Sequence, residues 1–445
     1  MDKILDRSRQ LKQNLVEFVL ESEGDLAVAL ESYVAANSHA QNKLYDTTYE
    51  RKLLIDSFLT EGKVRGQTPI DLFLANQSDL SESDRNLVKK WQNSFLGLFA
   101  VQEILPDGFE LMNWLTAKHY TVKPNDSRAL AQMAKFKNGE ILLTRISPIN
   151  DDYWMFSGPC LPLGNLGKPK LAVAIGNFKD LHKKHLYSDA PDLLEEAWRS
   201  VEQYHQDFLD FFGSDEVTMP GYQLNKKFTE FQEVITKKRL AAIGIDDSKS
   251  LEEIAKEAGV SQEEIAKTAK ELGADSQQIS QLFQSQGKPK MMLPKVELPD
   301  NIKKAEQVTV IAHPRWGQVI LPTYTRFKSF LVTEDWQNIP NGDKLIRKYL
   351  EDPEVNVFVW NRLTKEYPTE LEKLLQKYLK RPNFKLENDL NAILQKYKKP
   401  LEPELSEIAS VPIHLHNLFQ EAIAEVDKSN SKSKTPKNKT KGFAK

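Results

Sequence analysis

The sequence predicts an α+β protein that is mostly helical and multidomain and contains two small β-barrel or curved-sheet elements. The chain has 445 residues, enough for two to four domains. Most of it repeats apolar residues at helical spacing. Two stretches, 99–178 and 307–331, instead show short apolar runs between turn residues, which is typical of strands.

These changes of pattern divide the chain into eight segments. In order, we expect a helical domain, a small β-barrel-like domain, a helical segment, a trihelical helix-turn-helix-like module, a linker, a β element, a helical domain and a Lys-rich disordered tail. Their ranges are 1–98, 99–178, 179–236, 237–287, 288–306, 307–331, 332–427 and 428–445.

Helix signals dominate the first segment. The apolar residues of 26–34 recur on one helical face. Thr68 can cap a helix whose first residue is Pro69, because proline lacks only an N–H that would be unpaired at that position. Ser81 can cap the next helix, with Asp84 three residues later in a variant of the capping box.

The strand signals come next. In VQEILPDGFELMNWL, the residues Pro106-Asp107-Gly108 predict a hairpin turn. KHYTVKP, GEILLTRISPI and YWMFSGPCLPL follow, so about five short strands would close into a small barrel or a strongly curved sheet. The second β element is QVTVIAHPRWGQVILP, where the turn Arg315-Trp316-Gly317 leads into a strand from Gln318.

Three stretches carry a resemblance to a known group of proteins: FLTEGKVRGQTPIDLFL (58–74), GEILLTRISPINDDYWMFSGPCLPLG (139–164) and HQDFLDFFGSDEV (205–217). They resemble the N-terminal half of certain uncharacterised bacterial proteins. Many of those relatives end in the zinc-binding tail motif of the SecA translocase, which this chain lacks because it lacks the cysteines. The resemblance implies no activity.

The module at 237–287 combines helix starts and stops. Gly244, Gly259 and Gly273 can each end a short helix, and a capping residue follows each of them, so three helices are expected over 250–284. The first part resembles a DNA-reading helix-turn-helix. However, six glutamates and three lysines lie within 251–273, and carboxylates are repelled by phosphates. A folding or protein-binding module is therefore favoured over DNA reading.

Charge is unevenly distributed along the chain. The net charge is −2, but the last 18 residues contain seven lysines and no acidic residue. Residues 1–427 therefore contain 54 basic and 63 acidic residues, a net charge of −9. A body of that sign is a poor general binder of nucleic-acid backbones.

Few residue patterns indicate catalysis, and we expect no cofactor and no metal. The single cysteine, Cys160, excludes an intramolecular disulfide and a cysteine-based zinc site within one chain. His182 and His185 could belong to a metal site, but a solvated stretch is the simpler interpretation. GNLGKPK (164–170) has the glycines of a phosphate loop, yet Pro169 replaces the hydroxyl residue and no helix is expected after it.

Two groups of residues are candidates for binding. Arg315 and Trp316 resemble the start of small SH3-like barrels and could stack on a base or a peptide proline; alternatively, the tryptophan caps a small core. The tail lysines could attach to RNA or to an acidic protein surface, or could simply keep the end soluble. These lysines are Lys432, Lys434, Lys437, Lys439 and Lys441.

The sequence favours a non-enzymatic, cytoplasmic, protein-binding adaptor or assembly/chaperone-like factor without membrane insertion. The alternative is an RNA- or DNA-associated regulatory protein that uses the basic tail and the second β element. An enzyme is the third hypothesis, because a catalytic site that forms only in three dimensions gives no signal in one sequence. The sequence leaves the oligomeric state open.

Overall fold

A computed structural model describes residues 3–38, 47–125, 135–242, 291–292, 298–333, 339 and 341–433. The chain forms two compact units, Met1–Pro191 with Asn417–Lys445 and Asp192–His416. Most of the expected trihelical module and residues 434–445 of the tail lie outside the described residues, so the expectations for them stay predictions. The mostly helical α+β class is confirmed.

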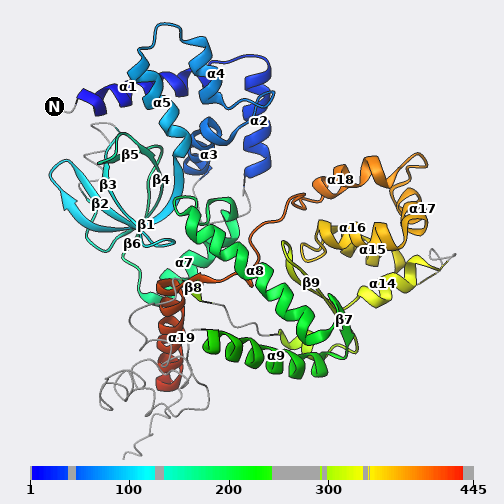
Figure 1. Ribbon diagram of the computed structural model, residues 1–445. Coiled ribbons are helices and arrows are strands. Elements are labelled where there is room, and N and C mark those ends of the chain that lie inside the picture. Colours follow the sequence, from blue (N-terminus) through cyan, green and yellow to red (C-terminus); the bar gives the residue numbers. More distant parts are fainter. Residues whose placement is uncertain are drawn as a thin grey trace, which may run out of the picture. The chain divides into compact units, whose positions relative to one another are not determined.

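Five helices open the first unit (Figure 1). Thr68 caps one of them by accepting the Asp71 N–H at 3.2 Å, and Pro69 follows at the first helical position. Ser81 caps the next by accepting the Asp84 N–H at 3.1 Å. Both predicted caps are confirmed. The helices are α1 (Lys3–Leu20), α2 (Asp25–Asn37), α3 (Thr47–Glu61), α4 (Pro69–Asn76) and α5 (Glu82–Lys90), followed by the short 3₁₀ helix η1 (Trp91–Asn93).

A closed five-stranded barrel follows these helices and confirms the predicted barrel (Figure 1). The neighbours around it are β1-β2-β3-β5-β4 and back to β1, with β3 and β5 parallel and the other pairs antiparallel. This is the strand order of the five-stranded Greek-key barrel called the OB-fold. The strands are β1 (Phe95–Leu105), β2 (Gly108–Asn113), β3 (His119–Lys123), β4 (Ile141–Pro148) and β5 (Trp154–Phe156), and β6 (Leu161–Gly164) extends the sheet beside β4.

Strand β1 closes the barrel because it pairs on both sides. Its first half pairs with β4 and its second half pairs with β2, with a bulge between Val101 and Glu103. A bulge increases local twist, which lets one strand serve two parts of a curved sheet. The barrel begins at Phe95, four residues before the expected residue 99. Its interior is apolar and consists of Phe95, Phe99, Val101, Phe109, Leu111, Val122, Leu142, Ile146 and Phe156.

The first unit also contains α7 (Lys168–Leu181), the 3₁₀ helix η2 (Lys183–His185) and most of α19 (Ile413–Ser433). The start of α7 corrects one expectation, because a helix does follow the glycines of 164–170. Pro169 lies in the first turn of that helix, where proline is tolerated, instead of marking a continuing loop.

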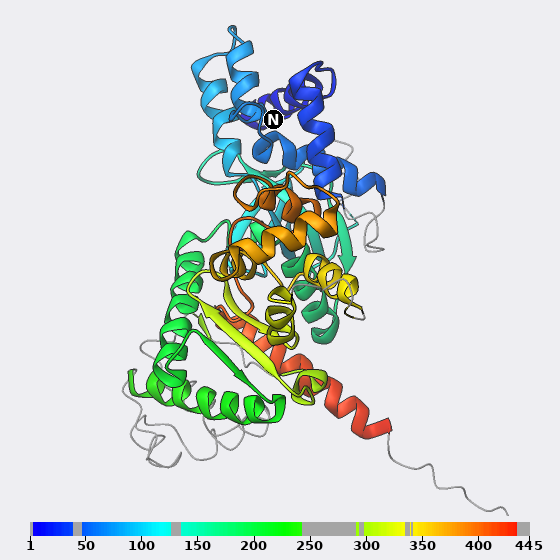
Figure 2. The ribbon, with the colours of Figure 1, turned by 90° about the vertical axis from the view of Figure 1, so that its right-hand side faces the viewer.

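The second unit contains a three-stranded sheet in the order β10-β9-β7 (Figure 2). The hairpin of β9 (Val308–His313) and β10 (Gly317–Leu321) confirms the predicted turn at 315–317. Strand β7 (Glu216–Met219) was not expected, since 179–236 is predicted to be helical. Its four residues lie between the long helices α8 (Pro191–Phe212) and α9 (Gly221–Ala242), too few for an alternating pattern to be recognised.

A helical bundle packs on this sheet and forms the largest apolar core described. Its helices are α14 (Tyr324–Leu331), α15 (Gly342–Glu351), α16 (Val357–Glu366), α17 (Pro368–Leu379) and α18 (Leu386–Lys396). The expected linker 288–306 contains two short elements: β8 (Met291–Met292), which pairs with β11 (Val411–Pro412), and α13 (Asp300–Lys303). Among the described helices, none is both long and apolar enough to cross a membrane.

Two glycines with positive φ allow a matched test of the β9–β10 turn. Gly317 (φ 69°) and Gly213 (φ 73°) both adopt a conformation that is unfavourable for alanine. A Cβ at Gly317 would also collide with Ser406, whereas one at Gly213 would meet open space. We expect Gly213→Ala to cost about 1–2 kcal/mol of unfolding free energy. Gly317→Ala should cost about 1–3 kcal/mol more because of the collision.

Urea unfolding of both variants measures this difference. Both glycines lie in the second unit, so the same transition reports on each of them. Equal losses in the two variants would contradict the close approach of the turn to Ser406.

Candidate functional site

The structure places the predicted binding pair, Arg315 and Trp316, in the β9–β10 turn. The Arg315 guanidinium lies 4.1 Å from the centre of the Trp198 ring, a cation–π contact within the second unit. Trp316 is half-buried and packs against the core of the helical bundle. The tryptophan therefore caps a core, one of the two alternatives for it, and the arginine already stacks on an aromatic ring of the chain itself.

The structure gives less information about the other candidate residues, which are the tail lysines and the pair His182 and His185. Lys432 lies in α19, and its side chain is outside the description. Lys434, Lys437, Lys439 and Lys441 lie outside the described residues. The rings of His182 and His185 are 6.3 Å apart. In the described part of the chain, no three His, Cys, Asp or Glu side chains are grouped so that they could hold a metal ion.

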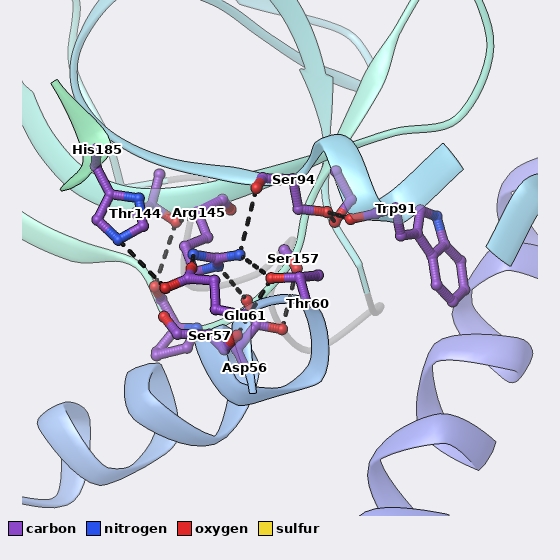
Figure 3. A network of polar contacts seen from close by, with 12 residues as sticks. Asp56, Ser57, Thr60, Glu61, Trp91, Ser94, Thr144, Arg145, Ser157 and His185 are labelled. Atoms are coloured by element: carbon purple, nitrogen blue, oxygen red, sulfur yellow. Dashed lines mark hydrogen bonds and ion pairs between the residues drawn. The ribbon is translucent and has the colours of Figure 1, made fainter. Parts of the chain in front are cut away.

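A buried ionic network, which the sequence does not reveal, lies between the first helices and the barrel (Figure 3). At its centre is Arg145 of β4, whose side chain is completely buried. Its guanidinium contacts Glu61 and Asp56, both from α3; Nε lies 3.1 Å from Asp56 Oδ2, without the alignment of a hydrogen bond. Lys12 of α1 contacts the same carboxylate, with Nζ 2.7 Å from Oδ1. We call Lys12, Asp56, Arg145 and the partly exposed Glu61 the buried ionic network.

Hydroxyl groups complete the polar contacts of the network. Thr60 Oγ1 accepts a hydrogen bond of 2.7 Å from Arg145, and Tyr33 donates one of 3.0 Å to Glu61. Ser157 Oγ accepts from Lys12 at 2.9 Å and donates to Asp56 at 3.0 Å. Buried charges are tolerated only when they are paired and hydrogen-bonded. Each charge here is paired and each residue has at least one hydrogen bond, but Asp56 Oδ2 and Arg145 Nε have an ionic contact without a hydrogen bond.

The charges within the network shift one another's pKa values. Burial alone would raise the pKa of Asp56, but the adjacent Lys12 and Arg145 outweigh burial and hold that pKa below its usual range. Burial lowers the pKa of Lys12, and the attraction of Asp56 opposes this only in part. The surroundings therefore favour the charged form of Asp56, whereas they disfavour the charged form of Lys12.

The lysine and the serine raise the question of catalysis. A lysine can act as a general base for a serine nucleophile when it is neutral and when substrate reaches the hydroxyl. Here Ser157 directs its proton to Asp56, and Lys12 is held between that carboxylate and the hydroxyl. All three residues are at least nine-tenths buried. The arrangement fixes the helices against the barrel, and Ser157, only 4% exposed, is withdrawn from solvent.

Cys160 and Lys399 belong to residue types that often act in catalysis, but the surroundings of both indicate a structural role. Burial of the Cys160 thiol raises its pKa to about 12, which makes it a poor nucleophile. Burial lowers the pKa of Lys399 to about 8. The ammonium group of Lys399 donates to the main-chain oxygens of Asp352 and Val355 at 2.6 and 2.7 Å, so it closes the end of α15.

One signal in the sequence could have indicated the network. In ILLTRISPI, which becomes β4, Arg145 is the only charged residue in an apolar run, and a charge at such a position needs a buried partner. The partners could not have been identified, because Asp56 and Glu61 lie more than 80 positions earlier in an ordinary helical pattern. Comparison with protein-family models, curated proteins and solved structures finds no match for this chain.

The network predicts an unusually costly substitution at Arg145. Arg145→Met would leave the buried Asp56 with Lys12 as its remaining cation and would take the arginine partner from Glu61, whose side chain is 32% exposed. Breaking a buried ion pair costs about 3–5 kcal/mol. Arg7→Met is the matched control, because it removes an ion pair of 2.8 Å with Asp84 in which the arginine is 40% exposed. Such surface pairs contribute up to about 1 kcal/mol. Thermal unfolding measures both, and similar small losses would contradict a stabilising role for the network.

His185 predicts a pH dependence of stability. Burial lowers its pKa to about 4, although Glu61 lies 3.7 Å away and opposes the shift. Between about pH 6.5, the ordinary histidine pKa, and about pH 4, His185 binds a proton in the unfolded chain but not in the folded chain. Stability contributed by neutral His185 is therefore present above pH ~6.5 and is lost as the pH falls toward 4.

The measurement compares unfolding free energies of the parent chain and His185→Gln over this pH range. Their difference should change by up to roughly 3 kcal/mol, since one pH unit corresponds to about 1.4 kcal/mol. A parallel curve for His185→Gln would contradict the prediction.

Proposed function

We propose that this chain is a non-enzymatic adaptor or assembly factor that binds another protein through the outer face of β1, β2 and β3. One observation carries the proposal, namely the chemistry of that face. In OB-fold barrels the face of strands 2 and 3 binds oligonucleotides or oligosaccharides. Carboxylates occupy that face here, so a basic protein surface suits it better than a phosphate backbone. We call the outward side chains of this face the acidic barrel face: Gln102, Glu103, Glu110, Met112, His119, Thr121 and Lys123. The lysine is paired with Asp107, with Nζ 2.9 Å from the carboxylate.

The register of the strands brings two carboxylates together on the acidic barrel face. Glu103 of β1 lies opposite Glu110 of β2, and both are accessible to solvent. Glu110 accepts a hydrogen bond of 2.9 Å from Thr121 and lies 3.8 Å from His119 Nδ1. Like charges opposite each other in a sheet are unfavourable. A partner that supplies lysine or arginine to this position would relieve the repulsion and gain electrostatic complementarity.

The same face disfavours phosphate backbones, which two adjacent carboxylates repel. The alternative, an RNA- or DNA-associated regulator, would therefore depend on the second β element and the lysine tail. Arg315 of that element already stacks on Trp198, so it would have to exchange an internal contact for a base. An enzyme remains the third hypothesis. Its best-placed residue types, Lys12 and Ser157, contact Asp56 and each other.

Affinity capture from native extract tests the proposal. The tagged full chain should retain protein partners after nuclease treatment, because the proposed contact needs no nucleic acid. The double substitution Glu103→Lys, Glu110→Lys should reduce their recovery at least about tenfold, since like-charge contacts replace complementary ones. Glu306→Lys, at an exposed residue of the other unit, is the control for a change of charge alone.

The outcomes separate the hypotheses. If nuclease removes the partners, or if deletion of 428–445 removes them while the double substitution does not, the nucleic-acid alternative replaces the proposal. Equal recovery with the double substitution and with Glu306→Lys would also contradict it.

A further inference from the structure

The β9–β10 turn is held by the ring of its first residue. His313 Nδ1 accepts hydrogen bonds from the main-chain N–H groups of Arg315 and Trp316, at 3.0 and 3.1 Å. An imidazole nitrogen can accept only when it carries no proton, so both bonds require a neutral ring with its hydrogen on Nε2. Protonation of Nδ1 would remove the acceptor and turn a third donor toward the two N–H groups.

This turn positions the side chains that follow His313. Gly317 pairs with His313 across the hairpin and has a positive φ of 69°. Between them, Arg315 reaches the ring of Trp198 on α8, and Trp316 packs against the bundle core. Loss of the two hydrogen bonds would therefore release the connection between the turn and α8.

The surroundings of His313 contain groups that affect its charge. Burial and the neighbouring His205 of α8 lower the pKa of His313, whereas Asp215 opposes them. Arg362 of α16 holds Asp215 through two hydrogen bonds, of 2.7 and 3.3 Å, and so neutralises much of its charge. On the same helix, the Phe358 ring lies 4.3 Å from the imidazole and adds no charge. The ring is thus neutral near pH 7 and becomes protonated in acid.

We propose that His313 is a pH-sensitive latch: protonation at Nδ1 breaks both hydrogen bonds, opens the 313–317 turn and frees Arg315 from Trp198. In the closed state the Arg315 guanidinium and the Trp198 ring contact each other. In the open state an aromatic ring and a guanidinium become available on the surface of the second unit. This inference concerns a different unit from the acidic barrel face and does not depend on the proposed function.

Hydrogen–deuterium exchange of the full chain tests the latch. The matched variant is His313→Asn, whose side-chain oxygen can accept the same two N–H groups in an Asx-turn but does not titrate. At about pH 7.5 the Arg315 and Trp316 amides should exchange at similar rates in both proteins. Because the pKa of His313 lies below the ordinary histidine value, the acid measurement is made at about pH 4, where these amides should exchange at least about tenfold faster in the parent chain. The intrinsic pH dependence of exchange cancels in this comparison.

Each result decides the question. An unchanged ratio of the two rates at both pH values would overturn the latch. If His313→Asn does not fold, the parent chain alone supplies the test through its own paired strands. Loss of protection in acid that is confined to 315–317 supports the latch, and equal loss along β9 and β10 overturns it, because the hairpin would then open as a whole.

Discussion

The arrangement of the first unit depends on the buried guanidinium of Arg145. A charge with no exposure to water must be paired, and its partners, Asp56 and Glu61, both come from α3. The helix must therefore lie with one edge along β4. Lys12 then brings α1 to the remaining charge of Asp56, so two helices and one strand are fixed by a single set of contacts. Apolar packing alone would tolerate small shifts of these elements; directional, buried contacts restrict them.

The second unit has a more hydrated counterpart of this network. Arg362 contacts Asp215, Glu216 and Glu366, and Lys328 contacts the same two glutamates, with side chains 20–40% exposed. Water and ions screen such pairs, so they contribute less energy than their number suggests. Their main effect is positional: Glu216 belongs to β7, and these contacts tie this short strand to α14 and α16. The three-stranded sheet of the unit is thus completed by polar contacts at its edge as well as by its ladder.

Local physics made much of the fold predictable. The caps at Thr68 and Ser81, the hairpin turn after Leu105 and the turn before Gly317 involve residues within four positions of each other, and all were expected from the sequence. The sequence did not predict β7 or the helix after Gly167, since a four-residue strand shows no periodicity and a proline can begin a helix as well as end one. The buried ionic network could not be predicted either, because its partners meet only when a helix and a strand from distant parts of the chain pack together.

The β9–β10 turn shows why residue types alone did not define a site. The sequence His313-Pro314-Arg315-Trp316 is compatible with a turn that binds a ligand. It is equally compatible with a turn whose polar and aromatic groups contact only other parts of the same chain. The geometry distinguishes the two possibilities. The unprotonated nitrogen of His313 accepts hydrogen bonds from N–H groups of the turn itself. The Arg315 guanidinium stacks on Trp198, which lies 117 positions earlier in the chain. An internal contact of this kind competes with any external ligand for the same atoms. Access to these side chains is then determined by the stability of the turn, and that stability depends on the protonation of one imidazole nitrogen.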